Sequence, residues 1–349
     1  MKRFKKLIAL SAVLAIALSL VACNTNSNDP KSPASGSGSG SQSQQQTGGD
    51  ISWPEKPITF VVPWSAGGDT DFFARALAKQ LTDELGQTVN VINTVGGGGS
   101  VASNEVKDSE PDGYTFLCFD TALALNQASG VTDSGYEAFD PVCLNAKNSG
   151  EYLVVRSDFP CNTIAELIEY SKANPGTVKL AANTGATSYY VAVKLTELGG
   201  DFNVVNAGSS SERVASLIGG HIDVSSHTMG VISQYLEGTG TGELKILGCM
   251  ATERSEAYPD IELATEQGVE LAYDMVYNIL APKGTDPAII DKLSSACEKV
   301  INNNEEYAKE IWDAYGAAPF FVDTEDAIAA LKADQEQYMA YADVFQSGL

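Results

Sequence analysis

Histidine and positive charge are scarce in this sequence. Its 349 residues include only two histidines, and its 22 Lys and Arg are outnumbered by 45 Asp and Glu, which gives a formal charge of −23. Binding to nucleic acid depends on Lys and Arg that displace counterions from phosphates, so this balance argues against a nucleic-acid partner. His221 and His227 lie six residues apart, which does not fit a His-Glu-x-x-His metal site. We expect each histidine to be a surface or packed residue.

Several enzyme signatures are also missing. The sequence contains no Gly-x-x-x-x-Gly-Lys-Ser/Thr loop, which excludes a nucleotide-binding P-loop of that type. It has no Gly-x-Ser-x-Gly elbow of the kind that carries the nucleophile of many hydrolases. No cysteine belongs to a Cys-x-x-Cys pair or has a histidine at ligand spacing.

Cysteine is infrequent in the part of the chain that we expect to fold. Five cysteines lie beyond residue 50, at positions 118, 143, 161, 249 and 297. An odd number in an exported protein leaves at least one thiol unpaired. We expect these cysteines to be small buried residues of the core, with a single disulfide as the alternative.

The N-terminal segment has the pattern of an export signal. Basic residues within the first six positions precede an apolar run over 7–21. This run of about 15 residues is shorter than the roughly 20 that span a membrane. It ends in Leu-Val-Ala-Cys at 20–23, which resembles a bacterial lipobox, in which the Cys is lipidated and becomes the new N-terminus. We predict a lipoprotein signal peptide over 1–22 and lipidation at Cys23, with a short membrane-anchor helix as the alternative.

The segment that follows has the composition of a flexible linker. Residues 24–50 consist almost entirely of Asn, Ser, Gly, Gln, Thr and Pro. Such a segment cannot bury enough apolar surface to offset its chain entropy. We therefore predict that 23–50 is a lipidated Cys followed by a disordered tether. This arrangement would hold a folded body at the outer face of the bacterial cytoplasmic membrane.

From residue 51 onwards, strand patterns alternate with helix patterns, which predicts parallel α/β sheets. Predicted strands cover 58–62, 89–92, 114–119, 152–155, 179–182, 202–205, 222–225 and 244–248. Helix starts are indicated by Thr163 with Glu166, by Ser209 with Glu212, and by Asp286 before Pro287. The order predicts two halves: domain 1 over 51–152 and 274–349, and domain 2 over 153–273.

Four loops between a predicted strand and a predicted helix are rich in Gly, Ser, Thr and Asn. They cover 63–70, 94–100, 183–188 and 206–211. Such loops lie at the carboxyl ends of strands, where open α/β sheets bind ligands. Helix N-termini offer free N–H groups and a positive dipole end, which suit a carboxylate without requiring a lysine. Four loops on two halves therefore favour a ligand cleft.

Three charged residues near these loops admit two roles each. Asp69 and Asp71 flank the start of the first helix, where an acid can cap the helix, and Asp71 can pair with Arg75 four residues later. If Asp69 faces the cleft instead, it disfavours a bare anion and suits a ligand with an amine or a hydroxyl. Arg213 could bind a carboxylate with its guanidinium. The pattern favours an exposed Arg213 beside Glu212.

Short motifs along the body occur in an order typical of one protein family. They include Val-Pro-Trp-Ser-Ala-Gly-Gly at 62–68, Pro-Asp-Gly-Tyr-Thr at 111–115, Leu-Ile-Gly-Gly-His-Ile-Asp at 217–223 and Ala-Pro-Lys-Gly-Thr at 281–285. In this order they resemble the solute-binding receptors of tripartite tricarboxylate transporters, also called the Bug-type family. The resemblance covers residues 53–349.

This resemblance implies a fold and a set of binding residues. The fold is α/β, periplasmic-binding-protein-like of type II, with a ligand cleft between two domains and with no catalysis, cofactor or metal. Backbone amides of the first two loops hold one carboxylate, and the second domain meets the far end of the ligand. The candidate ligand-binding residues are Trp64, Ser65, Ala66, Gly67, Gly68, Asp69, Thr70, Gly98, Gly99, Ser100, Asn183, Thr184, Thr187, Ser188, Asn206, Ala207 and Gly208.

The resemblance also implies partners. We expect a monomeric, lipid-anchored receptor that captures a small organic acid or an amino-acid-like solute. It would deliver this solute to a large and a small membrane subunit driven by an ion gradient. Two departures from the family pattern bear on the ligand: Asn206-Ala207-Gly208 stands where Pro-Tyr-Lys is frequent, and Asp69 replaces a small or uncharged residue. Alternative functions are a ligand sensor for a signalling system, an exported hydrolase with Asp69 or Asp71 as its base, and a structural adhesin.

Overall fold

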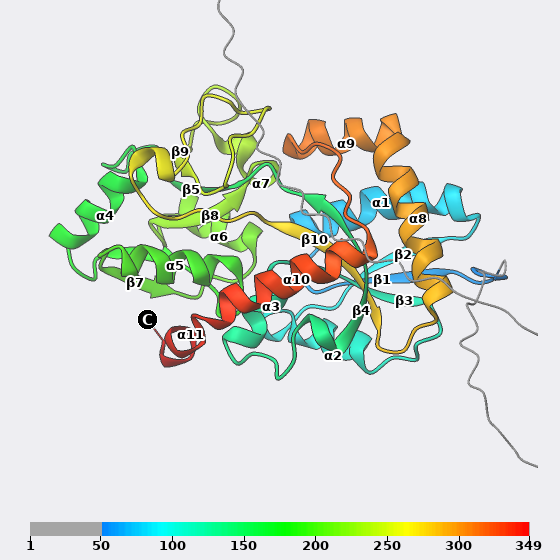
Figure 1. The fold of residues 1–349 in the computed structure, drawn as a ribbon. Coiled ribbons are helices and arrows are strands. Elements are labelled where there is room, and N and C mark those ends of the chain that lie inside the picture. The colour runs from blue at the N-terminus through cyan, green and yellow to red at the C-terminus, as the bar shows by residue number, and fades with distance from the viewer. Residues whose placement is uncertain (1–50, 349) are drawn as a thin grey trace, which may run out of the picture. The chain divides into compact units, whose positions relative to one another are not determined.

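The computed structural model describes residues 51–348, which contain two separate five-stranded sheets (Figure 1). The predicted signal peptide, the lipidation site at Cys23 and the tether lie outside the described residues. Within 51–348, no helix combines the length and the apolar character needed to cross a membrane. We call each sheet, together with the helices packed against it, a lobe.

The sheet of the first lobe has the strand order β2-β1-β3-β10-β4. Strands β2, β1 and β3 are parallel to one another, whereas β10 is antiparallel to both of its neighbours, β3 and β4. The strands are β1 (Ile58–Val62), β2 (Val89–Asn93), β3 (Thr115–Asp120), β4 (Phe139–Lys147) and β10 (Val276–Pro282).

The sheet of the second lobe has the equivalent order β7-β6-β8-β5-β9. Here β6 is parallel to β7 and β8, and β5 is antiparallel to β8 and β9. The strands are β5 (Glu151–Arg156), β6 (Val178–Ala181), β7 (Phe202–Val205), β8 (Val224–Thr228) and β9 (Leu244–Cys249).

The prediction of purely parallel sheets is therefore wrong for one strand position in each lobe. The chain leaves the first sheet after Lys147 and enters the second directly as β5, without an intervening helix. It returns from the second sheet to the first as β10, again without a crossover helix. A parallel neighbour requires a crossover connection that brings the chain back to the same end of the sheet. These two strands enter from the opposite lobe instead, so they run against their neighbours.

Helices cover both sheets (Figure 1). The predicted starts at Thr163, Ser209 and Asp286 are confirmed, because each of these side chains accepts a hydrogen bond from the first turn of its helix. The helices are α1 (Asp69–Leu85), α2 (Ser100–Lys107), α3 (Ala122–Ala128), α4 (Ile164–Ala173), α5 (Thr187–Glu197), α6 (Ser210–Ile218), α7 (Met229–Ile232), α8 (Pro287–Asn303), α9 (Glu305–Tyr315), α10 (Thr324–Met339) and α11 (Ala342–Ser347).

Each sheet has apolar clusters on both faces, and the C-terminal helices connect the two lobes. Ala327 and Leu331 of α10 pack in a first-lobe cluster with β3 and β4 residues. Tyr338, near the end of α10, and Phe345 of α11 pack in a second-lobe cluster instead. The five cysteines beyond residue 50 are free and buried, which confirms that they are core residues.

Candidate functional site

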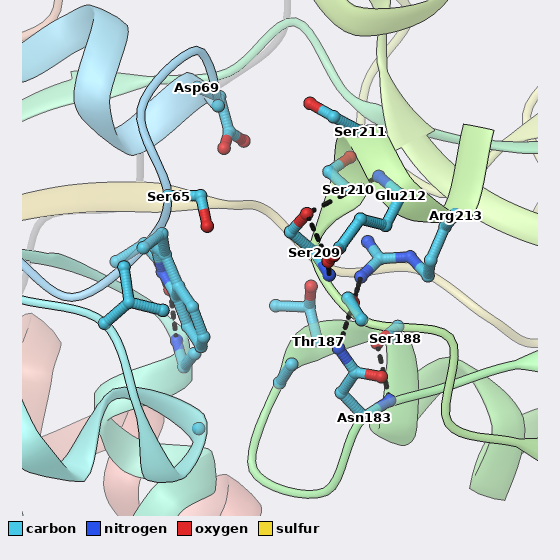
Figure 2. A pocket seen from close by; sticks show the side chains of 18 of the residues that line it. Ser65, Asp69, Asn183, Thr187, Ser188, Ser209, Ser210, Ser211, Glu212 and Arg213 are labelled. Atoms are coloured by element: carbon cyan, nitrogen blue, oxygen red, sulfur yellow. Dashed lines mark hydrogen bonds between the residues drawn. The ribbon is translucent and has the colours of Figure 1, made fainter. Parts of the chain in front are cut away.

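A pocket of about 620 Å³ lies between the loops of the two lobes (Figure 2). The first lobe contributes the loop between β1 and α1 and the glycine loop after β2, and the second lobe contributes the loops before α5 and α6. The pocket thus joins all four loops that composition singled out. Predicted residues that line it are Trp64, Ser65, Gly68, Asp69, Gly98, Ser100, Asn183, Thr184, Thr187, Ser188, Asn206 and Gly208.

Five predicted residues lie beside the pocket and are not part of its wall: Ala66, Gly67, Thr70, Gly99 and Ala207. At least three of them have contacts that shape the wall. The Gly67 amide donates to the Asp71 carboxylate, and the Thr70 hydroxyl donates to Asp120 over 2.8 Å. A Cβ on Gly99 would lie 2.6 Å from the Phe119 ring, so only glycine allows this close approach.

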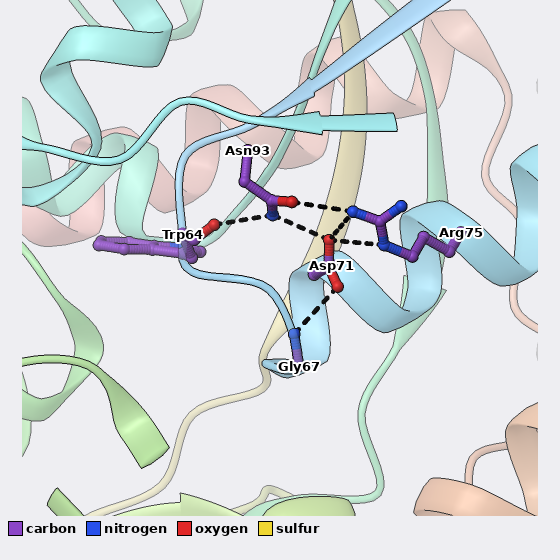
Figure 3. Close-up of polar contacts among 5 residues, drawn as sticks. All are labelled: Trp64, Gly67, Asp71, Arg75 and Asn93. Carbon is purple, nitrogen blue, oxygen red and sulfur yellow. Dashed lines mark hydrogen bonds and ion pairs between the residues drawn. The ribbon is translucent and has the colours of Figure 1, made fainter. Parts of the chain in front are cut away.

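Asp71 holds the first-lobe loop in place without facing the pocket (Figure 3). Its carboxylate accepts hydrogen bonds from the Gly67 amide at 3.0 Å, from Arg75 Nε at 2.9 Å and from Asn93 Nδ2 at 2.8 Å. Asn93 also donates to the Trp64 carbonyl. Burial opposes ionisation of Asp71, but these donors outweigh it and keep its pKa below the usual range. The predicted pairing of Asp71 with Arg75 is confirmed.

Asp69 turns the other way and lines the pocket. Gly68 occupies the cap position of α1, so Asp69 is the first helical residue and its side chain remains partly exposed. One carboxylate oxygen accepts from the Thr70 amide at 3.0 Å, and the other accepts from the Tyr277 hydroxyl at 2.7 Å. Asn148 donates to that hydroxyl oxygen, which directs the Tyr277 proton towards Asp69. Desolvation by the surrounding protein raises the pKa of Asp69.

A second acid, Asp120, lies at the end of β3 in the same wall. Three groups donate to its carboxylate: the Trp64 indole at 2.7 Å, the Thr70 hydroxyl at 2.8 Å and the Ala122 amide at 2.8 Å. Burial, together with the nearby charge of Asp69, raises the pKa of Asp120 to about 6. Three groups of the protein already donate to Asp120. This residue therefore mainly fixes the shape of the wall and is not a free acceptor for a ligand.

The second-lobe wall contains a buried guanidinium, that of Arg213. The expectation of an exposed Arg213 is wrong, since this residue is only 8% exposed. The capping box between Ser209 and Glu212 fixes the start of α6, and this places Arg213 on the same inward side as the buried Val214 and Leu217. Arg213 Nη1 donates to the Gly208 carbonyl at 3.1 Å. Burial lowers the pKa of Arg213.

Arg213 has unused hydrogen-bonding capacity. Its Nε is buried and without a partner, and no carboxylate within the described residues lies within the 4.0 Å of an ion pair.

His227, also in the wall, is 1% exposed and packed as expected. Its Nδ1 shares a 2.9 Å hydrogen bond with the Ser210 hydroxyl, while Nε2 has no partner. Burial and the charge of Arg213 hold the pKa of His227 well below its usual range, so this ring is neutral.

The two lobes touch beside the pocket through Asn126 of α3. Its Nδ2 donates to the Gly98 carbonyl of the first lobe at 2.9 Å and reaches the Gly185 carbonyl of the second lobe at 3.5 Å. A Cβ on Gly98 would lie 2.9 Å from the Thr184 carbonyl oxygen. The glycine loop therefore meets the loop before α5 without space for a side chain.

The comparison with known sequences identifies the family. Residues 73–340 match the Tripartite tricarboxylate transporter family receptor, TctC. The chain belongs to this receptor family. Among its relatives, Protein BugT of Bordetella pertussis is 29% identical over 296 residues, which cover 83% of this chain and 89% of BugT.

Solved structures share the fold of this TctC-family receptor. The periplasmic binding protein BugD superposes with a TM-score of 0.75 at 27% identity, over 84% of this chain and 98% of BugD. MatC from Rhodopseudomonas palustris, solved with bound malate, gives 0.73 at 24% identity, over 84% of this chain and all of MatC. The predicted family and fold class are therefore confirmed. The family is one of extracytoplasmic solute-binding receptors and not of enzymes.

Several residues that line the receptor's pocket were not among the predicted ligand-binding residues. Asp120 directly follows the predicted strand 114–119. Its position at the carboxyl end of a strand could have indicated a place in the site. Arg213 lies four residues before Leu217, which is the helical spacing of one face. Glu151 lies where the chain enters β5 and accepts a hydrogen bond from the Tyr273 hydroxyl. The direction of its side chain depends on how the chain crosses between the lobes.

Proposed function

We propose that this protein is the extracytoplasmic receptor of a tripartite tricarboxylate-type transporter and that it captures a small carboxylate-bearing solute in the pocket between its lobes. The observation that carries this proposal is the buried guanidinium of Arg213 in the pocket wall, whose Nε has no hydrogen-bond partner and which forms no ion pair within the described residues. A buried cation without a carboxylate partner is costly unless an anion completes its surroundings. A solute carboxylate supplies that anion.

The helices around Arg213 support the same proposal. The N-termini of α5 and α6 both reach the pocket wall through Thr187, Ser188, Ser210 and Ser211. The first amides of a helix have no intrahelical acceptor and lie at its positive end, so they favour an anion. A carboxylate near Arg213 would receive hydrogen bonds from both sources. The predicted lining residues of these two loops are thus proposed as ligand contacts.

The proposal includes delivery to a membrane transporter. The two lobes would close over the solute and present it to a large and a small membrane subunit. Lipidation at Cys23 would keep the receptor at the outer face of the cytoplasmic membrane. In cells labelled with a fatty acid, the wild-type protein should incorporate the label and Cys23→Ala should not, and equal incorporation by this variant would contradict lipidation at Cys23.

Ligand-dependent stabilisation tests the receptor function. We expect the thermal midpoint of the purified protein to rise with one class of carboxylate in a panel of mono-, di- and tricarboxylates, amino acids and neutral metabolites. A ligand at 100 times its dissociation constant adds about 2.7 kcal/mol of stability. Mass spectrometry of the denatured sample controls for a solute that co-purifies. No stabilisation by any member, together with no co-purified solute, would contradict the proposal.

A further inference from the structure

The two walls of the pocket differ in the hydrogen-bonding groups that have no partner within the protein. On the second lobe, Arg213 Nε has no partner, and Arg213 is more than nine-tenths buried. His227 Nε2 and Thr228 Oγ1, which belong to the same wall, are also buried without partners. In Figure 2, Arg213 lies beside Asn183 and Ser209 on the side opposite Ser65 and Asp69. These three groups of the second-lobe wall therefore have no hydrogen-bond partner within the described part of the protein.

The first-lobe wall offers acceptors instead. Asp69 carries two hydrogen bonds, from the Thr70 amide and the Tyr277 hydroxyl, whereas an ionised carboxylate has about four acceptor positions. Its side chain is partly exposed to the pocket, so the remaining positions are accessible. The neighbouring Asp120 adds a second negative charge to this wall, and its three donors are already in place.

A simple dicarboxylate fits these walls poorly. With one carboxylate on Arg213, its other carboxylate would face Asp69 and Asp120. Two like charges about 4 Å apart repel by about 4 kcal/mol at an effective dielectric constant of 20. The second-lobe wall does not relieve this repulsion, because Arg213 is already engaged by the first carboxylate. An ammonium group in the same place would gain hydrogen bonds and charge attraction from Asp69.

We infer that the solute is dipolar: its carboxylate binds Arg213 on the second lobe, and its ammonium group binds Asp69 on the first lobe. This inference rests on the proposed receptor function and narrows the solute class to amino acids in which both groups reach opposite walls. The two residues do not form an ion pair with each other within 4.0 Å, so both are available to the ligand. Asp69 and Arg213 are then specificity-determining residues of one site.

Titration calorimetry with matched probes tests this inference on the purified protein. Each amino acid has its ammonium and its carboxylate at opposite ends of the chain. It is compared with the dicarboxylate of equal length, for example 4-aminobutyrate with succinate. We expect the amino acid of the best-fitting length to bind at least tenfold more tightly. Asp69→Asn should remove this preference by weakening the amino acid and strengthening the dicarboxylate. Asp83→Asn makes the same charge change on the exposed side of α1 and should preserve the preference.

The outcomes separate the inference from the function on which it rests. Dicarboxylates that bind as tightly as their matched amino acids, or more tightly, would overturn the dipolar solute and leave the receptor function intact. A preference for amino acids that survives Asp69→Asn in a folded variant would overturn the role of Asp69. If neither probe class binds at any length, and no other carboxylate binds either, the proposed function fails and the inference fails with it. The wild-type comparison decides even if the variant does not fold.

Discussion

The two walls of the pocket are built from the same local unit but differ in charge: the first contains the acids Asp69 and Asp120, whereas the second contains the cation Arg213 together with Glu151 and Glu212. In each lobe, a parallel strand leads through a small-residue loop into the N-terminus of a helix. In the first lobe, the first turn of α1 contains Asp69 and Asp71, which offset the positive end of the helix. In the second lobe, α5 has no acid in its first turn. The charge of each wall therefore depends on the helix N-terminus together with the side chains of the first helical turn.

The second lobe also shows how an acid in a first turn can be kept from the ligand. Glu212 is the acid of α6, but its carboxylate accepts from the Ser209 amide and hydroxyl in the capping box. These hydrogen bonds lower the pKa of Glu212, and the bond from the Ser209 backbone amide has the larger effect. Glu212 thus satisfies the helix end although it also lines the pocket, and Arg213, one residue later, adds the buried cation of this wall.

The largest expected effect comes from removing the cation of the second-lobe wall. Arg213→Gln should weaken binding of every carboxylate ligand by about 30-fold or more, because loss of one partner from a buried charge pair costs about 2–5 kcal/mol. Calorimetry measures this loss. Arg254→Gln is the matched control, since this arginine is exposed and pairs with Glu266 on the surface. An affinity for Arg213→Gln within threefold of wild type would remove Arg213 from the site.

A smaller effect is expected where the two walls meet. Gly98→Val places a side chain 2.9 Å from the Thr184 carbonyl, so the lobes would have to separate at this contact, and affinity should fall about tenfold. Gly98 and Gly86 share a φ of +66°, but Gly86, at the end of α1, has no neighbour within 4 Å. Both valine variants should lose about 1–2 kcal/mol of stability through backbone strain, measured by denaturant unfolding.

Only the Gly98 variant should lose affinity, because only it disturbs the contact between the lobes. Equal affinities for the two variants would show that this contact does not control binding. A loss of affinity in both would mean that backbone strain alone explains the effect.

The loops of the site were predictable from composition, but the sign of each wall was not. Gly, Ser, Thr and Asn after predicted strands indicated the four loops because these residues make tight turns and begin helices. The direction of a side chain depends on where its helix begins and on what packs behind it. Asp69 and Asp71 are two residues apart, yet only Asp69 faces the pocket. Arg213 was misjudged for the same reason.

The parallel core of each sheet was also predictable, whereas the direction of its crossing strand was not. Strands such as β1 and β7 were predicted with the bounds they have, since apolar β-branched runs between turn residues leave little choice. The direction of β5 and β10 depends on the path of the chain between lobes. No residue pattern within these strands distinguishes a parallel from an antiparallel neighbour when both faces are buried.

The smallest expected effect concerns the stability of the acidic wall as pH changes. Burial is the main cause that raises the pKa values of Asp69 and Asp120 in the folded protein. The pKa of Asp120 reaches about 6. The folded state therefore holds these protons more tightly than the unfolded state, and this contribution to stability is lost as pH rises from about 4 through 6. Arg213 from α6 and Tyr277 from β10 oppose the shift at Asp69, and Glu151 from β5 faces the same site.

Asp69→Asn removes one raised carboxyl and the charge that contributes to the raised pKa of Asp120. The melting temperature of this variant minus that of the wild type should therefore increase between pH 4.5 and pH 7, by about 2 °C for each kcal/mol relieved in a chain of this size. Scanning calorimetry without ligand measures the difference, and Asp83→Asn should show none of this pH dependence. A difference that stays constant or decreases with pH would mean that Asp69 is not under electrostatic strain. The contrast between the two walls would then rest on Arg213 alone.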